Sequence, residues 1–498
     1  MTKSHYPTQE LLELDLKLDY KFCKKYYMKF TTKLIFIILL VATSCSKKLD
    51  LPPENILIES QVLANASSSE ALLASAYFKT YVAVRNYYYM SADLSTGNAM
   101  ALTTNGFVTL WNGNLIATSG LIQTLWNNHY SAINEANVII NLVPNASFSQ
   151  SIKTQLVAEA KFVRALNYFF LVRDFGSGAL TGNLSGPGVP LQLLHYSNYD
   201  PSKNIPRSTS QEVYTQILKD LNEAADNLTD LVTATPQVFR GRAQKTTCYA
   251  LASRVALYMR DYSKAVSYSA QALTNKSQYI LASSPALIFP VTTATSNIPF
   301  NAEFIFAFPT SYNSDLADNN LTGYYAKTAL WPDPAFLATF SPNDIRNSAS
   351  MMVVGNPTGP VTRVTPSKFA NPLGRDHLPI IRVSEIYLNR AEALVKSTNT
   401  INTEAIGLLN SIRQRSFPTG LKPLPFTLAS FATVTDLLNA ILRERRWELA
   451  FEGHDKFDKI RNGIAPNVAL TNQSKWVYPI PRREIDLTNG LITQNPGY

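Results

Sequence analysis

Cysteine is scarce in this chain of 498 residues, which contains three of them: Cys23, Cys45 and Cys248. Since Cys23 and Cys45 both lie near the N-terminus, the rest of the chain keeps a single thiol and has no partner for an internal disulfide. We therefore expect the folded part of the protein to be stabilised by packing alone.

Long apolar runs and blocks of basic residues are also missing. Beyond Ala42 no apolar run approaches the roughly 18 residues of a membrane-spanning helix, so we expect no such helix there. The net charge of +9 is spread along the chain and forms no track for nucleic-acid phosphates. We expect no nucleic-acid partner, and the hydrophobic fraction of 46% indicates a globular body.

Motifs for metal, nucleotide or acyl-transfer chemistry are absent as well. No histidine lies four residues from another, so the usual zinc spacings do not occur among His5, His129, His195, His377 and His454. No nucleophile elbow and no Walker lysine is present, and the glycines at 176, 178 and 182 have the wrong spacing for a phosphate loop and predict a turn. We expect neither a metal nor a cofactor.

A short apolar segment near the N-terminus, residues 33–45 (KLIFIILLVATSC), is present instead. Its nine apolar residues reach only about half of the roughly 30 Å hydrocarbon layer, so the segment is too short to span a membrane. The order of a lysine, an apolar run, Thr43 and Ser44, then Cys45 is typical of a bacterial lipoprotein signal. An ordinary core helix does not require this order. We therefore predict a targeting segment at 1–44 and a lipid anchor at Cys45.

The residues on either side of this apolar segment support the same interpretation. Residues 11–25 mix acids with lysines, whereas residues 28–33 form a short basic region, so we expect the true start at Met28. Residues 46–59 are largely polar and contain Pro52 and Pro53, which suits an extended tether. Acyl chains on Cys45 would hold the folded part at a bilayer, since each buried methylene contributes about 0.8 kcal/mol.

Helical periodicity dominates the chain after the tether. Residues 123–142 and 152–172 carry apolar side chains at spacings of three and four, which predicts two helices with one buried face each. Thr209 and Glu212 have the spacing of a capping box and predict the start of a third helix. Within residues 243–273, small and aromatic residues alternate on two helices around a turn near Asp261, as in a tetratricopeptide hairpin.

A second hairpin of this kind is predicted from residues 384–396 and 403–415. The fold class is therefore all-α, with stacked tetratricopeptide-like helix hairpins in an α-α superhelix. Two stretches rich in aromatic and polar residues, 77–111 and 278–375, lack helical periodicity and are predicted to be long irregular insertions. Long irregular segments on a rigid scaffold commonly carry binding surfaces.

Carboxylates at intervals of four, Glu444, Glu448 and Glu452, allow two interpretations. Like charges placed this way can raise a pKa for acid catalysis. The favoured alternative is an ion-pair ladder, because helix faces with alternating charge are usually solvated or paired. The arginines expected to hold these acids are Arg443, Arg445, Arg446, Arg390 and Arg413.

Candidate sugar-binding residues lie in the irregular stretches. Aromatic faces stack on the C–H bonds of sugar rings, while carboxylates and guanidinium groups bind hydroxyls. On this chemistry we expect the ligand-binding residues to be Trp111, Trp331, Tyr325, Asp93 and Arg85.

Several segments resemble the SusD/RagB family of nutrient-binding outer-membrane lipoproteins. The likeness covers nearly the whole chain after Cys45, and its order and spacing are specific. Its clearest motifs are AEAKFVRALNYFFLVRDFG (158–176), LPIIRVSEIYLNRAEAL (378–394), LNSIRQR (409–415), RERRWELAFEGHDKFDK (443–459), IRNG (460–463) and YPIPRREIDLTNGLITQNPGY (478–498).

The resemblance implies a non-enzymatic, surface-exposed protein of the outer membrane, anchored by lipid. Such a protein sits over a SusC-like TonB-dependent transporter and passes it an oligosaccharide, or in some members a peptide. It also implies an N-terminal region at 45–240 and a C-terminal region at 241–498 that contains the hairpins and the insertion 278–375.

Three hypotheses follow from the residues and the resemblance together. The leading one is a tethered glycan-binding subunit of an outer-membrane importer. A second is a peptide-binding or protein-interaction lipoprotein whose hairpins grip protein partners. A third, less favoured, is a membrane-tethered glycoside hydrolase that uses Glu448 or Glu452.

Overall fold

The computed structural model of the chain describes most residues after position 62. The described ranges are 63–85, 87–101, 108–178, 181–231, 239–291, 300–309, 330–354, 364–371 and 376–498. All of them belong to one compact unit, residues 59–498. The predictions for the targeting segment, Met28, Cys45, the tether and Tyr325 concern residues outside these ranges.

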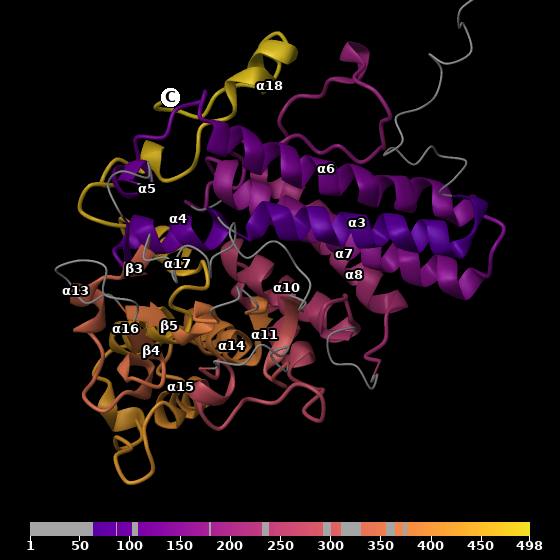
Figure 1. The fold of residues 1–498 in the computed structure, drawn as a ribbon. Coiled ribbons are helices and arrows are strands. Elements are labelled where there is room, and N and C mark those ends of the chain that lie inside the picture. Colours follow the sequence, from indigo (N-terminus) through magenta and orange to yellow (C-terminus); the bar gives the residue numbers. More distant parts are fainter. Residues whose placement is uncertain are drawn as a thin grey trace, which may run out of the picture. The chain divides into compact units, whose positions relative to one another are not determined.

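Long helices build the N-terminal half of this unit. They are α3 (Ala66–Val84), α6 (Gly120–Leu142), α7 (Gln150–Phe175) and α8 (Ser210–Asn227). Each packs against the next along the chain, and Figure 1 shows them side by side. Helix α7 lies at the centre, since from Leu156 onward nearly every side chain is buried. Its buried charges are paired, as Arg164 is with Asp220 at 2.7 Å.

Helix hairpins continue the stack in the C-terminal half. The first pairs α10 (Lys245–Tyr258) with α11 (Tyr262–Ala272), and the second pairs α14 (Val383–Thr398) with α15 (Thr403–Arg415). Asp261 begins α11 by accepting a hydrogen bond from the backbone N–H of Lys264, at the predicted turn. Helices α11 and α14 pack together, so both predicted hairpins and the all-α fold class are confirmed.

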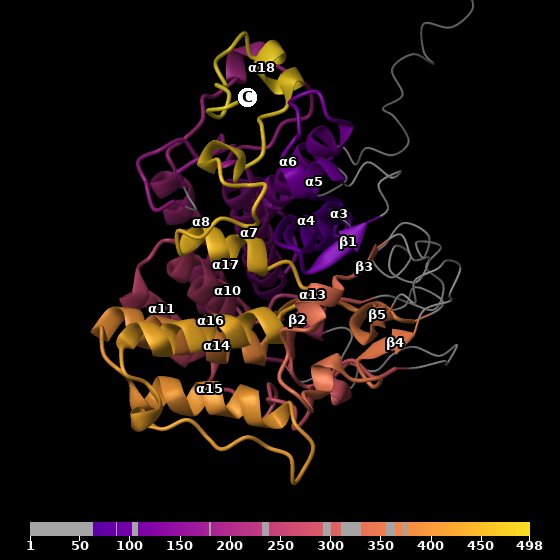
Figure 2. The same cartoon turned by 90° about the vertical axis from the view of Figure 1, so that its left-hand side faces the viewer.

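The remaining helices close this half, and Figure 2 shows α16 beside α14 and α15. They are α16 (Val434–Glu448), α17 (Asp455–Arg461) and α18 (Arg482–Leu487), with the shorter α4 (Tyr87–Thr96), α5 (Val108–Asn112) and α13 (Pro334–Leu337). Single 3-10 turns occur at η2 (Val143–Asn145), η3 (Pro201–Lys203), η4 (Pro285–Leu287), η6 (Ile345–Asn347), η7 (Ser367–Phe369), η8 (Leu428–Ser430) and η9 (Gln473–Lys475).

In the described part of the chain, three two-stranded antiparallel sheets accompany the helices. Strand β1 (Ala99–Ala101) pairs with β3 (Leu330–Pro332), β2 (Phe304–Phe308) with β6 (Leu378–Arg382), and β4 (Met352–Val354) with β5 (Val364–Pro366). Most of these strands fall in the predicted insertion 278–375, whose described residues contain only short elements. They join distant parts of the chain rather than forming a separate layer.

Local signals at two helix ends were predicted correctly. The backbone N–H of Thr209 donates to Glu212 Oε2 at 2.8 Å, and that of Glu212 donates to Thr209 Oγ1 at 3.2 Å, which completes the capping box of α8. Helix α7 ends at Phe175 with Gly176 as its C-cap, and Gly182 has φ +85°, as a turn requires.

The prediction of an irregular stretch at 77–111 is wrong in its larger part. Helix α3 continues to Val84, and α4 and α5 occupy much of the rest. Tyr77, Tyr81 and Val84 are spaced by four and three residues and are all buried, and the Tyr81 ring lies 5.7 Å from that of Phe308 in an edge-on arrangement. Buried side chains do recur at helical spacing here, but the pattern is difficult to recognise in the sequence because aromatic residues also occupy neighbouring positions.

None of the described helices combines the length and the hydropathy needed to cross a bilayer. The main hydrophobic core runs from α3 through α7 and α10 to the C-terminal segment around Trp476 and Ile480. A second core lies between α14, α15 and α16.

Candidate functional site

The pairing of β1 with β3 brings together the two stretches that carry the candidate tryptophans. Met100 of β1 lies directly opposite Trp331 of β3, although more than 200 residues separate them in sequence. Figure 2 shows this ribbon beside α4 and α13. Side chains that face each other across an antiparallel pair lie on the same side of the sheet. Met100, which is 43% exposed, and the half-buried Trp331 therefore share one face.

Trp111 lies against the turn that leads into the same ribbon. Gly97, between α4 and β1, has φ +74°, and a Cβ at this position would lie 3.2 Å from Cζ3 of Trp111. Asn467 holds α5 in place, because its Nδ2 donates to the carbonyl oxygens of Trp111 at 2.9 Å and Ser95 at 2.6 Å. We call Gly97, Met100, Trp111 and Trp331 the tryptophan surface.

The other tryptophans serve different purposes. Trp126 and Trp476 are 3% and 4% exposed and belong to the core. Trp447 stacks on Phe340 with 5.6 Å between ring centroids, and its Nε1 donates to Thr339 Oγ1 at 3.0 Å. Trp111 and Trp331 are both half-buried. Trp447 is half-buried too, but one face of its ring is covered by Phe340, so Trp111 and Trp331 stay the predicted pair for contact with a ligand.

Asp93 lies beneath the tryptophan surface, in α4, and is 2% exposed. Its Oδ1 accepts hydrogen bonds from Asn98 Nδ2 at 3.2 Å and from the backbone N–H of Phe451 at 3.1 Å, while Oδ2 has no hydrogen-bond partner within the described ranges. Burial raises the pKa of Asp93 to about 7, against the opposing effect of these two hydrogen bonds. Its direct contact with a ligand stays a prediction.

Arg85 is the C-cap of α3 and is half-buried. Its guanidinium carbon lies 5.8 Å from the centre of the Tyr81 ring, and its Nε and Nη1 are buried without a hydrogen-bond partner among the described residues. Among the residues that the structure describes, Arg85 makes no hydrogen bond or ion pair to the tryptophan surface, so its role in binding also stays a prediction.

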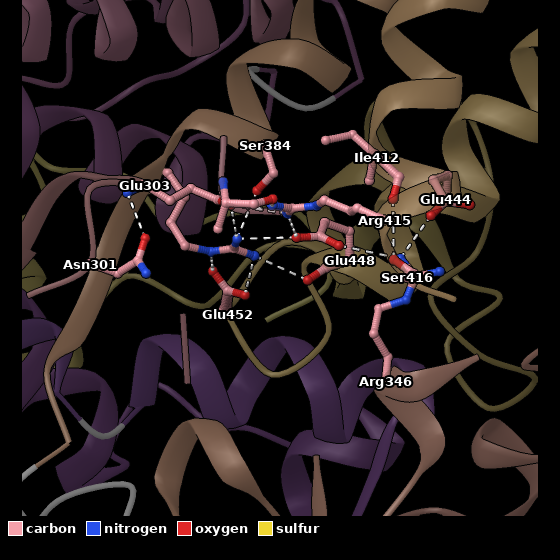
Figure 3. Close-up of polar contacts among 12 residues, drawn as sticks. Asn301, Glu303, Arg346, Ser384, Ile412, Arg415, Ser416, Glu444, Glu448 and Glu452 are labelled. Carbon is pink, nitrogen blue, oxygen red and sulfur yellow. Dashed lines mark hydrogen bonds and ion pairs between the residues drawn. The ribbon is translucent and has the colours of Figure 1, made fainter. Parts of the chain in front are cut away.

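The three glutamates at the C-terminal end of α16 and in the turn after it form a buried ion-pair network (Figure 3). Glu444, Glu448 and Glu452 are each 3% exposed or less. Glu448 Oε1 accepts hydrogen bonds from Arg415 at 2.6 Å and Arg382 at 3.1 Å. The favoured interpretation of these carboxylates as an ion-pair network is confirmed.

The predicted partners of these glutamates are wrong. They pair with Arg346, Arg382, Arg415 and Lys368, which come from η6, β6, α15 and η7. Arg445 instead pairs with Asp458, Arg446 with Asp455 and Arg390 with Glu404, while Arg413 and Arg443 lie over the rings of Phe426 and Trp447. The acids face inward, towards segments distant in sequence, and not along their own helix.

The electrostatics of this network do not suit acid catalysis at Glu448. Burial favours a higher pKa, but Arg415, Arg382 and Arg346 hold the pKa of Glu448 well below its usual range. A glycosidase acid must be protonated and reach the scissile oxygen. The cavity next to Glu448 has a volume of about 20 Å³, enough for about one water molecule.

Burial raises the pKa of Glu444, which pairs with Arg346 at 2.7 Å. A wider depression of about 440 Å³ lies between residues 337–348 and Pro418. Its aromatic residue, Phe340, is 8% exposed and stacked on Trp447, so it offers no open ring face to a sugar. Within the described ranges, no group of three or more His, Cys, Asp or Glu side chains is arranged to hold a metal ion.

Several residues that build the tryptophan surface were not singled out from the sequence. Gly97, Asn98, Met100 and Asn467 act through backbone geometry and hydrogen bonds. The one local signal is the Gly97–Asn98 pair, which is typical of a turn between two elements.

Comparison with known proteins places the chain among SusD-like sequences. Residues 49–257 match the family model described as "Starch-binding associating with outer membrane", and residues 356–474 match the model described as "SusD family". SusD-like protein P38 of Formosa agariphila is 25% identical over 537 aligned residues, which cover 95% of this chain and 100% of that protein.

Comparison with solved structures supports the same assignment. A SusD superfamily protein from Bacteroides thetaiotaomicron has a TM-score of 0.74 and 26% identity, covering 87% of this chain and 100% of its own. A putative sugar binding protein from Bacteroides vulgatus has a TM-score of 0.69 at 23% identity, over 87% of this chain and 98% of its own, and supports the fold. With both family models, a full-length relative and the structural match in agreement, this chain belongs to the SusD/RagB family.

Proposed function

We propose that this protein captures oligosaccharides at an outer membrane and stacks their sugar rings on Trp111 and Trp331. The observation that carries the proposal is the β1–β3 pairing, which brings both tryptophans to one short segment although they are distant in sequence. Two half-buried indoles beside an exposed methionine offer the flat apolar faces that sugar C–H bonds prefer. The description of the matched family model, starch-binding, supports a glycan ligand.

A binding assay on residues 46–498 tests the ligand class. We expect at least one member of a glycan panel to bind, and Trp111→Ala or Trp331→Ala to weaken that binding about 10- to 100-fold, since losing a stacked aromatic contact costs about 1.5 to 3 kcal/mol. Tyr196→Ala is the control, because this tyrosine is 39% exposed on a separate loop. Binding of peptides but of no glycan would favour the peptide-binding alternative.

The second part of the proposal concerns how the protein works at the membrane. Cys45 carries the lipid anchor, and the protein passes its glycan to a SusC-like TonB-dependent transporter without breaking bonds. The sequence 33–45 and the family description "associating with outer membrane" support the anchor and the location. The neighbouring arginines keep Glu448 ionised, and an ionised carboxylate has no proton to give to a glycosidic oxygen. This supports a role without catalysis.

Three measurements test this second part. Labelled palmitate should enter the full-length protein and not the Cys45→Ala variant, and the full-length protein should copurify with a TonB-dependent barrel. Incubation of the protein with every glycan that it binds should release no shorter product. Turnover by the wild type that disappears in Glu448→Gln, under conditions where thermal melts show this variant still folded, would instead establish the hydrolase hypothesis.

A further inference from the structure

Asn98, next to Gly97 of the tryptophan surface, is buried and uses both its backbone and its side-chain polar groups in hydrogen bonds. It is 0% exposed, and each of its four backbone and side-chain polar groups has a partner. Its backbone N–H donates to the Asp93 carbonyl at 3.0 Å, and its own carbonyl accepts from the N–H of Asp333 at 2.9 Å. Its Nδ2 donates to Asp93 Oδ1 at 3.2 Å, and its Oδ1 accepts from Arg446 Nε at 3.0 Å.

These four bonds connect three separate parts of the chain. Asp93 belongs to α4, Asp333 follows strand β3 directly, and Arg446 belongs to α16. Asn98 itself stands between Gly97, which contacts Trp111, and β1, whose Met100 pairs with Trp331. Asn98 therefore fixes two segments that contact the tryptophans: the turn at Gly97, which lies against Trp111, and the end of β3, which contains Trp331.

The side chain must both donate and accept at this position. Asp93 Oδ1 is buried and takes a donor from Asn98 Nδ2, while Asn98 Oδ1 shares the single N–H of Arg446 Nε with Asp455 Oδ2, which lies 3.1 Å from that nitrogen. An amide satisfies both needs, whereas an alanine would satisfy neither and an aspartate would place a second carboxylate against Asp93. Unmet hydrogen bonds at a buried site are expensive, so the turn would relax away from the arrangement that holds the indoles.

We propose that Asn98 is a positioning residue that sets the relative placement of Trp111 and Trp331 by locking the α4–β1 turn to β3 and α16. Its importance for glycan capture rests on the function proposed above. The placement of the two indoles is a property of the free protein and is tested without any ligand.

Fluorine NMR of the protein labelled with 5-fluorotryptophan measures this placement directly. The chain has five tryptophans, and Trp111→Phe and Trp331→Phe assign the two relevant resonances. We expect Asn98→Ala to shift or broaden both of these resonances by more than a linewidth. The resonances of the core residues Trp126 and Trp476 should stay in place.

Two further variants make the test decisive. Arg446→Gln removes one bond to Asn98 from a side chain that is 27% exposed, so the protein should fold and show smaller shifts of the same two resonances. Asn137→Ala is the matched control, because Asn137 is also 0% exposed and hydrogen-bonded, but to residues of another region such as Arg164 and Gln192. This control should leave both resonances unchanged.

The outcomes separate the positioning role from the proposed function. If Asn98→Ala and Arg446→Gln leave the Trp111 and Trp331 resonances in place, or if all five resonances move alike, Asn98 has no selective positioning role. If the two resonances move and the panel glycan bound best by the wild type binds about tenfold more weakly, both proposals stand. If they move but no glycan binds the wild type, the positioning role stands and the glycan function fails.

Discussion

Burial sets the chemistry of Asp93 and changes what this residue can do. Its carboxyl group is 2% exposed and has one oxygen with two donors and one with none among the residues that the structure describes. Desolvation disfavours the charged form and brings the pKa to about 7, with Asp455 raising it further and Lys368 lowering it. Asp93 therefore carries a proton in a pH range where an exposed aspartate has lost it.

Replacement of Asp93 by asparagine should remove a pH-dependent loss of stability. The folded protein keeps the proton of Asp93 up to about pH 7, whereas the unfolded chain loses it near 3.8, so this group makes folding less favourable as pH rises between these values. We expect the free energy of unfolding of Asp93→Asn, relative to wild type, to rise by about 2 kcal/mol between pH 5 and pH 8. Urea unfolding at several pH values measures this difference.

The control for this prediction is Leu487→Ser, also in α18, which changes a side chain that is 40% exposed and has no proton to titrate. Its difference from wild type should not depend on pH. A difference for Asp93→Asn that stays flat over the same range would show that Asp93 is ionised in the folded protein throughout.

Glu448 gives the opposite case of a buried carboxylate that is held charged. It accepts hydrogen bonds from three arginines, and Glu448→Gln would remove the one negative charge that all three share, although each arginine keeps another carboxylate partner. We expect a loss of about 3 to 5 kcal/mol in the free energy of unfolding. Glu404→Gln breaks the pair of Arg390 with a glutamate that is 50% exposed and should lose about 1 kcal/mol or less.

Denaturant midpoints of the two variants, measured side by side, test this contrast. Similar losses in both would mean that the buried network contributes no more than a surface pair. At the scale of single residues, the sequence was enough to identify the acids as paired. It was not enough to name Arg346, Arg382 and Arg415, because strand and helix packing brings these residues in from other segments.

At the scale of elements, the turn between α4 and β1 is the point where a small change should reach the tryptophan surface. Gly97→Ala places a Cβ at φ +74° and 3.2 Å from the Trp111 ring. Left-handed backbone costs a residue with a Cβ about 1 to 2 kcal/mol, and the ring must also move. We therefore expect lower stability and a several-fold weaker glycan affinity.

Gly420→Ala separates backbone strain from displacement of the ring. Gly420 has φ +88°, and a Cβ there would meet nothing within 4 Å. Gly420→Ala should lose about 1 to 2 kcal/mol from backbone strain alone and bind glycan as the wild type does, whereas Gly97→Ala should lose more stability because the Trp111 ring must also move. Equal glycan affinities in the two variants would place Trp111 outside the binding contacts. Thermal melts and titration of a bound panel glycan provide both measurements.

Helices were predictable here and strands were not, for a physical reason. The hairpins α10–α11 and α14–α15 repeat small and large side chains over many residues, so their period is visible. Strands β1 and β3 have three residues each, too few for alternation to appear, and their pairing depends on Asn98 and Asp333 far apart in sequence. The candidate tryptophans could be chosen from the sequence, but their proximity could not.

At the scale of the whole folded unit, the C-terminal segment ties the two halves together. The N–H of Tyr478 donates to the Asp174 carbonyl at 2.7 Å, and Asn495 Nδ2 donates to the Phe175 carbonyl at 2.8 Å, so residues after 475 complete the end of α7. The ring of Phe175 lies edge-on to Trp126 and Tyr478, at 5.1 and 5.9 Å. The stretch is therefore part of the N-terminal core, although it follows the C-terminal hairpins.

Removal of residues 476–498 should for this reason unfold the N-terminal helices as well. The deletion takes away Trp476, Val477, Tyr478, Ile480 and Ile492, all buried, at about 1.5 to 3 kcal/mol for each side chain. The sum is comparable with the whole stability of a typical domain, about 5 to 15 kcal/mol. We expect the truncated chain to show no cooperative thermal transition.

A single substitution in the C-terminal segment should lower the free energy of unfolding by a measurable amount. Asn495→Ala removes the donor to the carbonyls of Phe175 and Tyr478; the Phe175 oxygen keeps Arg207 Nη2 at 3.1 Å, whereas the Tyr478 oxygen loses the donor, so the change should cost about 1 to 3 kcal/mol. Leu487→Ser and Leu491→Ser change side chains of the same segment that are 40% and 42% exposed, and should stay within about 0.5 kcal/mol of wild type. If Asn495→Ala melted like these surface variants, the C-terminal segment would be an attachment to the N-terminal core and not a part of it.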